Sequence, residues 1–351
     1  MAKSHLKAPD WLLTLSFAYL AILATLSVLN QIGADRWWFG ALNLYLPQVI
    51  WAVPGVLIAA ISLIVAWRWT WVPLLGVALV AGPLMGLCWP LHSTHKPSAG
   101  LPLRVMTWNI KYGIHDKLAH MAIMYEIERN KPTVVLLQDA GGVLNSPLGD
   151  YFSTWNVRSD GQYIIASKLP LSVFQVRRIS FYGEEHTCLR TQLQFGGTKV
   201  ALYNVHLQSP REGLDAMRIA RNKPRNLPKA IQQLKYNVKA RLIQVHALRE
   251  YLRQESGPVI IAGDLNSPDS SQVCAILRDI NLHDAFAEGG KGYGYTYGHF
   301  LFQNKLPDHN LSWMRIDHIM MSSQFQSRNC WVGTGKASDH RPVIADLVLG
   351  L

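Results

Sequence analysis

The sequence contains little cysteine and lacks any paired cysteine motif. Its four cysteines, among 351 residues, include no Cys-x-x-Cys pair, so neither a zinc module nor a clear disulfide framework is indicated. Internal repeats and low-complexity tracts are also absent, and the composition of the chain excludes a disordered protein. The cysteines alone do not identify the redox compartment.

Charge is scarce in the first 100 residues, which hold only seven charged side chains separated by long apolar runs. Each run is long enough for a helix across a bilayer, which needs about 20 apolar residues. Tryptophans gather near the ends of these runs, where amphipathic rings meet lipid headgroups. Three such runs in series argue against a cleaved signal peptide or a soluble core. We expect a membrane domain at 1–90 with three transmembrane helices, at about 12–30, 45–66 and 71–89.

The few charges near these runs indicate an orientation. Lys3, Lys7 and Arg68 would share one side of the membrane, opposite Arg36 and Lys96. The positive-inside rule then places the N-terminus in the cytoplasm. After three spans, the rest of the chain lies outside it. We therefore expect a multi-pass protein of the cell membrane with an extracytoplasmic soluble domain.

The second part of the chain has the composition of an ordinary soluble domain. Residues 91–102 are rich in Pro, Ser and Gly, which is typical of a linker, and the domain itself is expected at 103–351. Short β-type runs alternate there with helical stretches, a pattern that predicts an α/β domain with covered sheets. The expected helices are about 117–130, 228–255 and 270–279. The expected strands are 103–110, 133–138, 162–166, 189–195, 199–206, 258–262, 315–321 and 342–349.

Polar residues recur where these expected strands begin or end. A single Asn or Asp at such a position is usually a turn residue, but an ordered series of them indicates a site on a rigid framework. The residues in this series are Asn109, Asp139, Asn204, His206, Asp264, Asn266, Asp317, Asp339 and His340.

This ordered series resembles the endonuclease/exonuclease/phosphatase superfamily, which includes DNase I, inositol-phosphate 5-phosphatases and neutral sphingomyelinases. The resemblance covers about 103–349, nearly the whole soluble part. It implies a four-layer α/β sandwich of the DNase I-like type. It also implies a divalent metal, Mg²⁺ or Mn²⁺, used in the hydrolysis of a phosphoester.

The resemblance assigns a metal role to three of these residues. Asn109 and Asp139 match positions that hold the metal, and Asp339 lies on the metal side of the turn that carries His340. Hard oxygen ligands of this kind suit Mg²⁺. One departure stands out, because the family pair is Gln-Glu and this chain has Gln138-Asp139. Aspartate is one methylene shorter, which withdraws its oxygens by roughly 1.5 Å.

The remaining residues match positions with catalytic roles. Asp264 and Asn266 correspond to the pair that orients the attacking water and steadies the phosphate. His340 corresponds to the histidine that faces the phosphoryl group, and a carboxylate such as Asp317 fixes the tautomer of such a ring. The same comparison makes His206 the donor of a proton to the leaving oxygen. Asn204 is then a hydrogen-bonding residue of the site, whereas His318, on the opposite face of its strand from Asp317, is expected to be structural.

A basic stretch accompanies these motifs. Residues 211–253 contain eleven basic and three acidic side chains, which is typical either of a solvated helix face or of a patch that meets anionic headgroups or a nucleic-acid backbone. The loop 291–299, rich in Gly and Tyr, either lines a substrate entrance or is a mobile surface loop.

Together these observations predict a membrane-anchored, metal-dependent phosphoesterase. A tether to the lipid bilayer favours a lipid phosphoester, either a diester or a monoester, over nucleic acid as the substrate. Two alternatives stay open: a membrane-bound DNase I-like nuclease, and a catalytically weak binding or scaffold protein of the same fold. The sequence indicates no particular protein partner.

Overall fold

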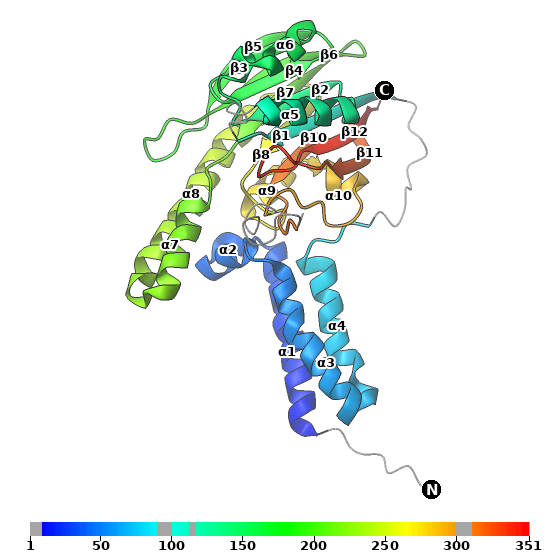
Figure 1. Cartoon of the computed structure of the whole chain (residues 1–351), viewed down its shortest axis with the longest axis vertical. Helices are drawn as coiled ribbons and strands as arrows, with labels where there is room; N and C mark the ends of the chain where they lie inside the picture. Colours follow the sequence, from blue (N-terminus) through cyan, green and yellow to red (C-terminus); the bar gives the residue numbers. More distant parts are fainter. Residues whose placement is uncertain (1–8, 90–99, 112–116, 299–310, 351) are drawn as a thin grey trace. The chain divides into compact units, whose positions relative to one another are not determined.

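A computed structural model of the chain describes residues 9–89, 100–111, 117–298 and 311–350. Most of the linker expected at 91–102 lies outside these ranges. The chain forms two compact units, Met1–Leu87 and Cys88–Leu351, whose helices and strands are labelled in Figure 1.

The N-terminal unit is a small helical bundle. Tyr19 lies at its centre, where its hydroxyl donates a hydrogen bond to the carbonyl of Trp51, 2.8 Å away. Gly55 and Gly76 make room for this side chain, because a Cβ atom at either position would lie 2.4 Å from one of its atoms. Small residues allow such close helix packing. The helices are α1 (Asp10–Gln31), α2 (Trp38–Leu44), α3 (Ala52–Val65) and α4 (Trp71–Leu79).

Two segments of this unit are long and apolar enough to cross a membrane, Asp10–Gln31 and Gln48–Val65. Only 28% of the most apolar window of each segment is buried within the protein, whereas the core helix of a soluble protein is mostly buried. The third expected span, at 71–89, stays a prediction. Its helix α4 continues into a π-helical segment at Val80–Leu84, which contains Pro83, a residue that cannot donate a backbone hydrogen bond.

The second unit is built on two mixed β-sheets of six strands each. The first sheet has the order β11-β12-β1-β2-β4-β3, and the second has the order β5-β6-β7-β8-β10-β9. Each contains one parallel pair, β1 with β2 and β7 with β8. The strands of the first sheet are β1 (Leu101–Asn109), β2 (Val134–Gln138), β3 (Asn156–Asp160), β4 (Tyr163–Ser167), β11 (Phe325–Val332) and β12 (Val343–Leu349). Those of the second are β5 (Leu171–Arg178), β6 (Thr187–Phe195), β7 (Thr198–His206), β8 (Val259–Asp264), β9 (Leu282–Asp284) and β10 (Asp317–Ser322).

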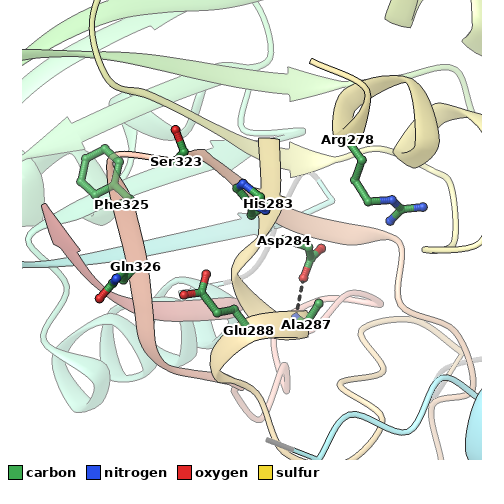
Figure 2. A pocket seen from close by; sticks show the side chains of 8 residues that line it. All are labelled: Arg278, His283, Asp284, Ala287, Glu288, Ser323, Phe325 and Gln326. Atoms are coloured by element: carbon green, nitrogen blue, oxygen red, sulfur yellow. Dashed lines mark hydrogen bonds between the residues drawn. The ribbon is translucent and has the colours of Figure 1, made fainter. Parts of the chain in front are cut away.

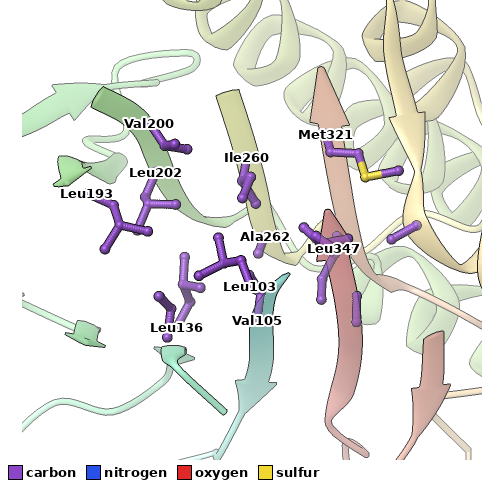
Figure 3. Packing of buried hydrophobic residues seen from close by; sticks show 14 of the residues in the cluster. Leu103, Val105, Leu136, Leu193, Val200, Leu202, Ile260, Ala262, Met321 and Leu347 are labelled. Atoms are coloured by element: carbon purple, nitrogen blue, oxygen red, sulfur yellow. The ribbon is translucent and has the colours of Figure 1, made fainter. Parts of the chain in front are cut away.

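The two sheets pack face to face between layers of helices. Figure 3 shows the apolar core between the sheets, where Val105 and Leu136 of the first sheet lie near Leu202 and Ile260 of the second. A second core joins the first sheet to helices on its outer face, and a third joins the second sheet to α8 and α9. The predicted four-layer α/β sandwich is therefore confirmed. The helices of this unit are α5 (Lys117–Asn130), α6 (Pro147–Tyr151), α7 (Arg211–Asn222), α8 (Leu227–Leu252), α9 (Gln272–Arg278) and α10 (Ala285–Gly289).

Candidate active site

Strand register brings three of the predicted residues into one row on the second sheet. His206 at the end of β7 is the register partner of Asp264 at the end of β8, and Asp264 is in turn the partner of Asp317 at the start of β10. Side chains that share a row on neighbouring strands lie on the same face of the sheet. The first and the last of these three residues, His206 and Asp317, are 111 positions apart in the sequence, and the fold makes all three neighbours.

The first sheet contributes a matching row. Asn109 ends β1 beside Gln138, which ends the parallel strand β2. Hydrogen bonds connect the two sheets at this edge. The amide nitrogen of Asn109 donates to Oδ2 of Asp264 at 3.1 Å, and that of Gln138 donates to Oδ1 of Asn204 at 2.7 Å.

The turn before β12 completes this edge of the sandwich. Because β12 is antiparallel to β1, its start lies beside the end of β1. The Ser338 hydroxyl donates to the Asn109 carbonyl at 2.7 Å and accepts from the His340 backbone at 3.1 Å. The indole of Trp108 donates to the carbonyl of His340 at 3.0 Å. These contacts fix the position of His340 at the sheet edge.

Asp264 is the centre of the site. Its Oδ2 atom accepts from Asn109 and lies 3.5 Å from Nε2 of His206 and 3.6 Å from Nε2 of His340. Its Oδ1 atom accepts a hydrogen bond from the Asn266 backbone at 2.8 Å. Asp264 is 1% exposed, and this burial raises the pKa of its carboxyl group, which favours a role in accepting a proton.

His340 and Asp317 form a buried pair. Nδ1 of His340 lies 2.9 Å from Oδ2 of Asp317, so Nε2 is the ring nitrogen that faces Asp264. Burial by itself lowers the pKa of His340, but the carboxylates of Asp317 and Asp264 outweigh that effect and raise it to about 10. The ring is consequently positively charged at neutral pH, beside the carboxylate that is central to the site.

His206 lies on the other side of Asp264. Its Nδ1 atom is 2.7 Å from Oε1 of Gln162 and 3.5 Å from Oδ1 of Asp139. Its side chain is 16% exposed, against 7% for His340 and 1% for Asp264. The ring is thus the most accessible of these three side chains.

Asn204 and Asn266 hold the backbone of the site in place. The amide of Asn204, which is fully buried, donates to the carbonyls of Leu137 and Ile164, so it supports the strand ends beneath the site. The amide of Asn266 donates to the Leu207 carbonyl at 2.8 Å. The hydrogen-bonding role expected for Asn204 stays a prediction as far as substrate is concerned.

Three residues near the site adopt left-handed backbone conformations, one after each of the strands β1, β2 and β8. They are Lys111 at φ 41°, Asp139 at φ 49° and Asn266 at φ 48°. Such conformations are uncommon for residues other than glycine, although Asn and Asp tolerate them best, and they concentrate at functional sites. Lys111 pairs with Asp339 and Asp139 lies beside His206, whereas the amide of Asn266 donates to the Leu207 carbonyl.

Lys111 is a site residue that the sequence reasoning missed. Its backbone donates to Oδ1 of Asn109 at 2.9 Å, and its ammonium group forms an ion pair with Oδ2 of Asp339. The side chain of Lys111 is 48% exposed, whereas that of Asp339 is 5% exposed. The position of this positive charge, two residues after Asn109, is visible in the sequence. The left-handed backbone conformation at Lys111 is not.

The donor set at this edge fits a hard divalent cation. Asn109, Asp139 and Asp339 all offer oxygen atoms, the type of ligand that Mg²⁺ prefers. Oδ1 of Asp339 is buried and has no hydrogen-bond partner among the described residues, and such an atom is expected to have one. Asp264, Asp317 and His340 also form a close group of potential ligands, but His340 and Asp317 already satisfy each other.

The tyrosine-rich loop closes one side of the site. The ring of Tyr297 packs against that of His340, with 4.8 Å between centroids, and the positive charge of Arg211 lies near its hydroxyl. The hydroxyl of Thr296 accepts from the backbone of Asp317 at 3.3 Å. The described part of the loop at 291–299 therefore adjoins the site.

His318 lies on the opposite face of β10 from Asp317. Its ring is completely buried, with Nδ1 2.7 Å from Oδ2 of Asp284 and Nε2 3.0 Å from the carbonyl of Ser267. Arg315 donates to the same oxygen of Asp284 at 2.7 Å. This arrangement agrees with a structural role for His318.

A pocket at the edge of the second sheet is separate from this site. Figure 2 shows it between β9, α10 and the start of β11, and Asp284, which lines it, also contacts His318. None of the predicted site residues lines it. Its lining residues are Arg278, His283, Asp284, Ala287, Glu288, Ser323, Phe325 and Gln326.

Comparison with known proteins gives a family and a fold. Residues 106–340 match the model of the Endonuclease/Exonuclease/phosphatase family. Among solved structures, truncated TDP2 of Caenorhabditis elegans is 21% identical with a TM-score of 0.52, covering 71% of this chain and 98% of its own. A mannosyl-6-phosphatase of Bacteroides thetaiotaomicron is 15% identical with a TM-score of 0.53, covering 70% and 100%.

A third structure, TDP2 of D. rerio complexed with a single-strand DNA product, is 17% identical with a TM-score of 0.52, covering 70% of this chain and 98% of its own. At these identities the likeness concerns the fold alone. Among curated proteins, no sequence matches this chain.

Proposed function

Because this chain belongs to the endonuclease/exonuclease/phosphatase family, whose members are phosphoester hydrolases, we propose that it is a membrane-anchored enzyme that hydrolyses a phosphoester bond of a lipid. The observation that carries the hydrolytic part is the convergence of Asn109, His206 and His340 on one carboxylate oxygen of Asp264. A buried carboxylate in this position can accept a proton, and the two imidazoles that flank it can donate protons.

The proposed proton transfers use three side chains. Asp264 orients the attacking water and accepts its proton as the new phosphorus–oxygen bond forms. His340, charged at neutral pH, donates a hydrogen bond to a phosphoryl oxygen and stabilises the negative charge that develops there. His206, the more accessible histidine, donates a proton to the leaving oxygen as the second phosphorus–oxygen bond breaks.

Asn109, Asp139 and Asp339 would hold the divalent cation, for which we propose Mg²⁺ or Mn²⁺. The cation, when bound, neutralises charge on the phosphoryl oxygens. Asn109 links this part of the site to Asp264 directly. Oδ1 of Asp139 lies 3.5 Å from Nδ1 of His206, so the proposed metal ligands also adjoin that ring.

The membrane part of the proposal rests on α1 and on the segment Gln48–Val65. Both are apolar and expose most of their apolar windows. In the second segment, Leu57 is 60% exposed, Leu63 is 64% exposed and Ile64 is 86% exposed. Aliphatic side chains at that exposure are stable in hydrocarbon and costly in water. A tethered site meets lipid headgroups continually, which favours a lipid substrate.

A nuclease is the second candidate, because the D. rerio structure of this fold holds a single-strand DNA product and the stretch 211–253 is basic. A single panel of assays separates the candidates. The purified full chain should release phosphate or headgroup from lipid vesicles with Mg²⁺, lose that activity in EDTA and leave DNA intact. Cleavage of DNA but not lipid would favour the nuclease, and no turnover of either would favour the scaffold.

We also propose that the catalytic domain faces away from the cytoplasm, on the charge bias of Lys3, Lys7 and Arg68 and on a third membrane crossing at 71–89. A reporter enzyme that works only outside the cytoplasm, fused after Leu351, should then be active. Activity of a cytoplasmic reporter at the same position would reverse the orientation, and cytosolic phosphoesters would become the candidate substrates.

A further inference from the structure

Helices α7 and α8 form an antiparallel hairpin that extends past the sandwich (Figure 1). The second half of α8 packs on the second sheet through Val245, Leu248 and Leu252. Its first half packs on α7 instead. Asn237 accepts a hydrogen bond from the Gly213 backbone at 2.8 Å, and a Cβ atom at Gly213 would lie 2.8 Å from the Leu234 backbone.

The end of this hairpin, residues 218–229, which we call the hairpin tip, carries more basic side chains than nearby acidic residues can neutralise. It contains Arg221, Lys223, Arg225 and Lys229, all exposed, in addition to Arg218, which pairs with Asp215 at 3.1 Å. The other four form no ion pair among the described residues, and no acidic residue occurs between Asp215 and Glu250. The stability of the fold does not explain this charge.

Aliphatic side chains accompany the charges at the hairpin tip. Ile219 is 51% exposed and Leu227 is 39% exposed, and they flank the turn that joins the two helices. Exposed aliphatic groups among cations are typical of segments that lie at a bilayer surface, where the cations meet anionic headgroups and the aliphatic groups enter the acyl boundary.

The residues that single-stranded nucleic acid would need are missing from this surface. Stacking of bases requires aromatic side chains, and residues 216–235 contain none. The nearest aromatic residue, Tyr236, donates to Glu184 at 2.9 Å and stacks on Tyr182 with 5.0 Å between centroids. It is therefore already engaged within the protein.

We propose that the hairpin tip binds the surface of a bilayer that contains anionic phospholipid, with Ile219 and Leu227 entering the headgroup region. This interaction is additional to the transmembrane anchor and independent of the catalytic residues. A fixed second contact with the bilayer restricts how the catalytic domain can turn relative to the membrane surface.

An environment-sensitive fluorophore at the hairpin tip tests this proposal in the full chain. NBD is attached to Ile219→Cys in a Cys88→Ser background, since the other three cysteines are buried. The protein is reconstituted in two kinds of nanodisc. One contains phosphatidylcholine alone, and the other contains phosphatidylcholine with about 30% phosphatidylglycerol. NBD emission should shift to shorter wavelength only with the anionic lipid, and the shift should shrink in high salt. NBD at Tyr125→Cys, exposed on α5, should report no difference.

Charge reversal provides the matched comparison. Each Lys or Arg near an anionic surface contributes about fivefold in binding, so reversing four of them should abolish the shift. The tip variant carries Arg221→Glu, Lys223→Glu, Arg225→Glu and Lys229→Glu. The control variant carries Arg129→Glu, Arg178→Glu, Lys199→Glu and Lys336→Glu, which are exposed elsewhere, and it should keep the shift.

Each contrary result overturns the proposal. An unchanged NBD spectrum on anionic nanodiscs, or equal loss in both charge variants, would exclude specific binding by the hairpin tip. A shift produced by added DNA and not by anionic lipid would assign the tip to nucleic acid. If the chain does not enter nanodiscs, the transmembrane anchor is wrong, and vesicles of the same two compositions added to the protein still test the tip.

Discussion

Replacing His340 with alanine should lower turnover by about a hundredfold or more, because a positioned acid–base group contributes on that scale. The ring is held by Asp317 at 2.9 Å and faces Asp264. Its loss removes the positive charge beside the phosphoryl group. His206→Ala should cost a similar factor, and Asp264→Asn, which preserves side-chain size, should cost at least as much. Steady-state kinetics on the substrate found in the assay panel would measure all three.

His318 is the matched control, since it is a histidine of the same strand on the opposite face from Asp317. His318→Gln should leave turnover within a few-fold of the wild type but lower the melting temperature, because Asp284 loses a buried partner. If His318→Gln lost as much activity as His340→Ala, with both proteins equally stable, the division between catalytic and structural histidines would be wrong.

The control also has a pH signature. Burial and the charge of Arg315 lower the pKa of His318, but Cys274 and the hydrogen bond to Asp284 outweigh them and raise the pKa to about 10. A raised pKa stabilises the folded state fully below the unfolded value of about 6.5 and progressively less as pH approaches 10. The difference in melting temperature between wild type and His318→Gln should therefore be larger at pH 6 than at pH 10.

The sequence revealed the interior strands and missed the edges of the sheets. All eight expected strands match interior strands, from β1 to β12. The four missed strands, β3, β5, β9 and β11, are the outermost strands of the two sheets. An interior strand such as β2 is buried along its whole length, whereas β3 has no fully buried residue. Continuous apolar runs predict strands covered on both faces, and edge strands carry no such signal.

The candidate site was predictable to the extent that it follows strand ends. His206, Asp264 and Asp317 are polar residues beside apolar runs, so their positions were visible. Their register was not, because it depends on which strands pair. Lys111 was missed for a different reason: its relevance comes from an ion pair with Asp339, 228 positions away, and no local pattern encodes a contact of that kind.

Asp139 lies where the resemblance drawn from the sequence leads us to expect glutamate, and Asp139→Ala should abolish Mg²⁺-dependent turnover. Loss of one carboxylate leaves Asp339 as the single anionic ligand among the three proposed. That ligand already pairs with Lys111. Isothermal titration with Mg²⁺ measures the binding directly, independent of activity. Lys111→Met serves as the companion variant: it frees Asp339 and should tighten Mg²⁺ binding.

Asp139→Glu then distinguishes two forms of the site. If the site keeps the family geometry and is merely loose around the shorter side chain, glutamate should tighten Mg²⁺ binding. If it is refitted around aspartate, glutamate should crowd His206, which lies 3.5 Å from Oδ1 of Asp139, and weaken both binding and turnover. We expect the second result, because the left-handed turn at φ 49° already places Asp139 beside that ring. Unchanged turnover and unchanged Mg²⁺ binding in Asp139→Ala would exclude Asp139 from the metal site altogether.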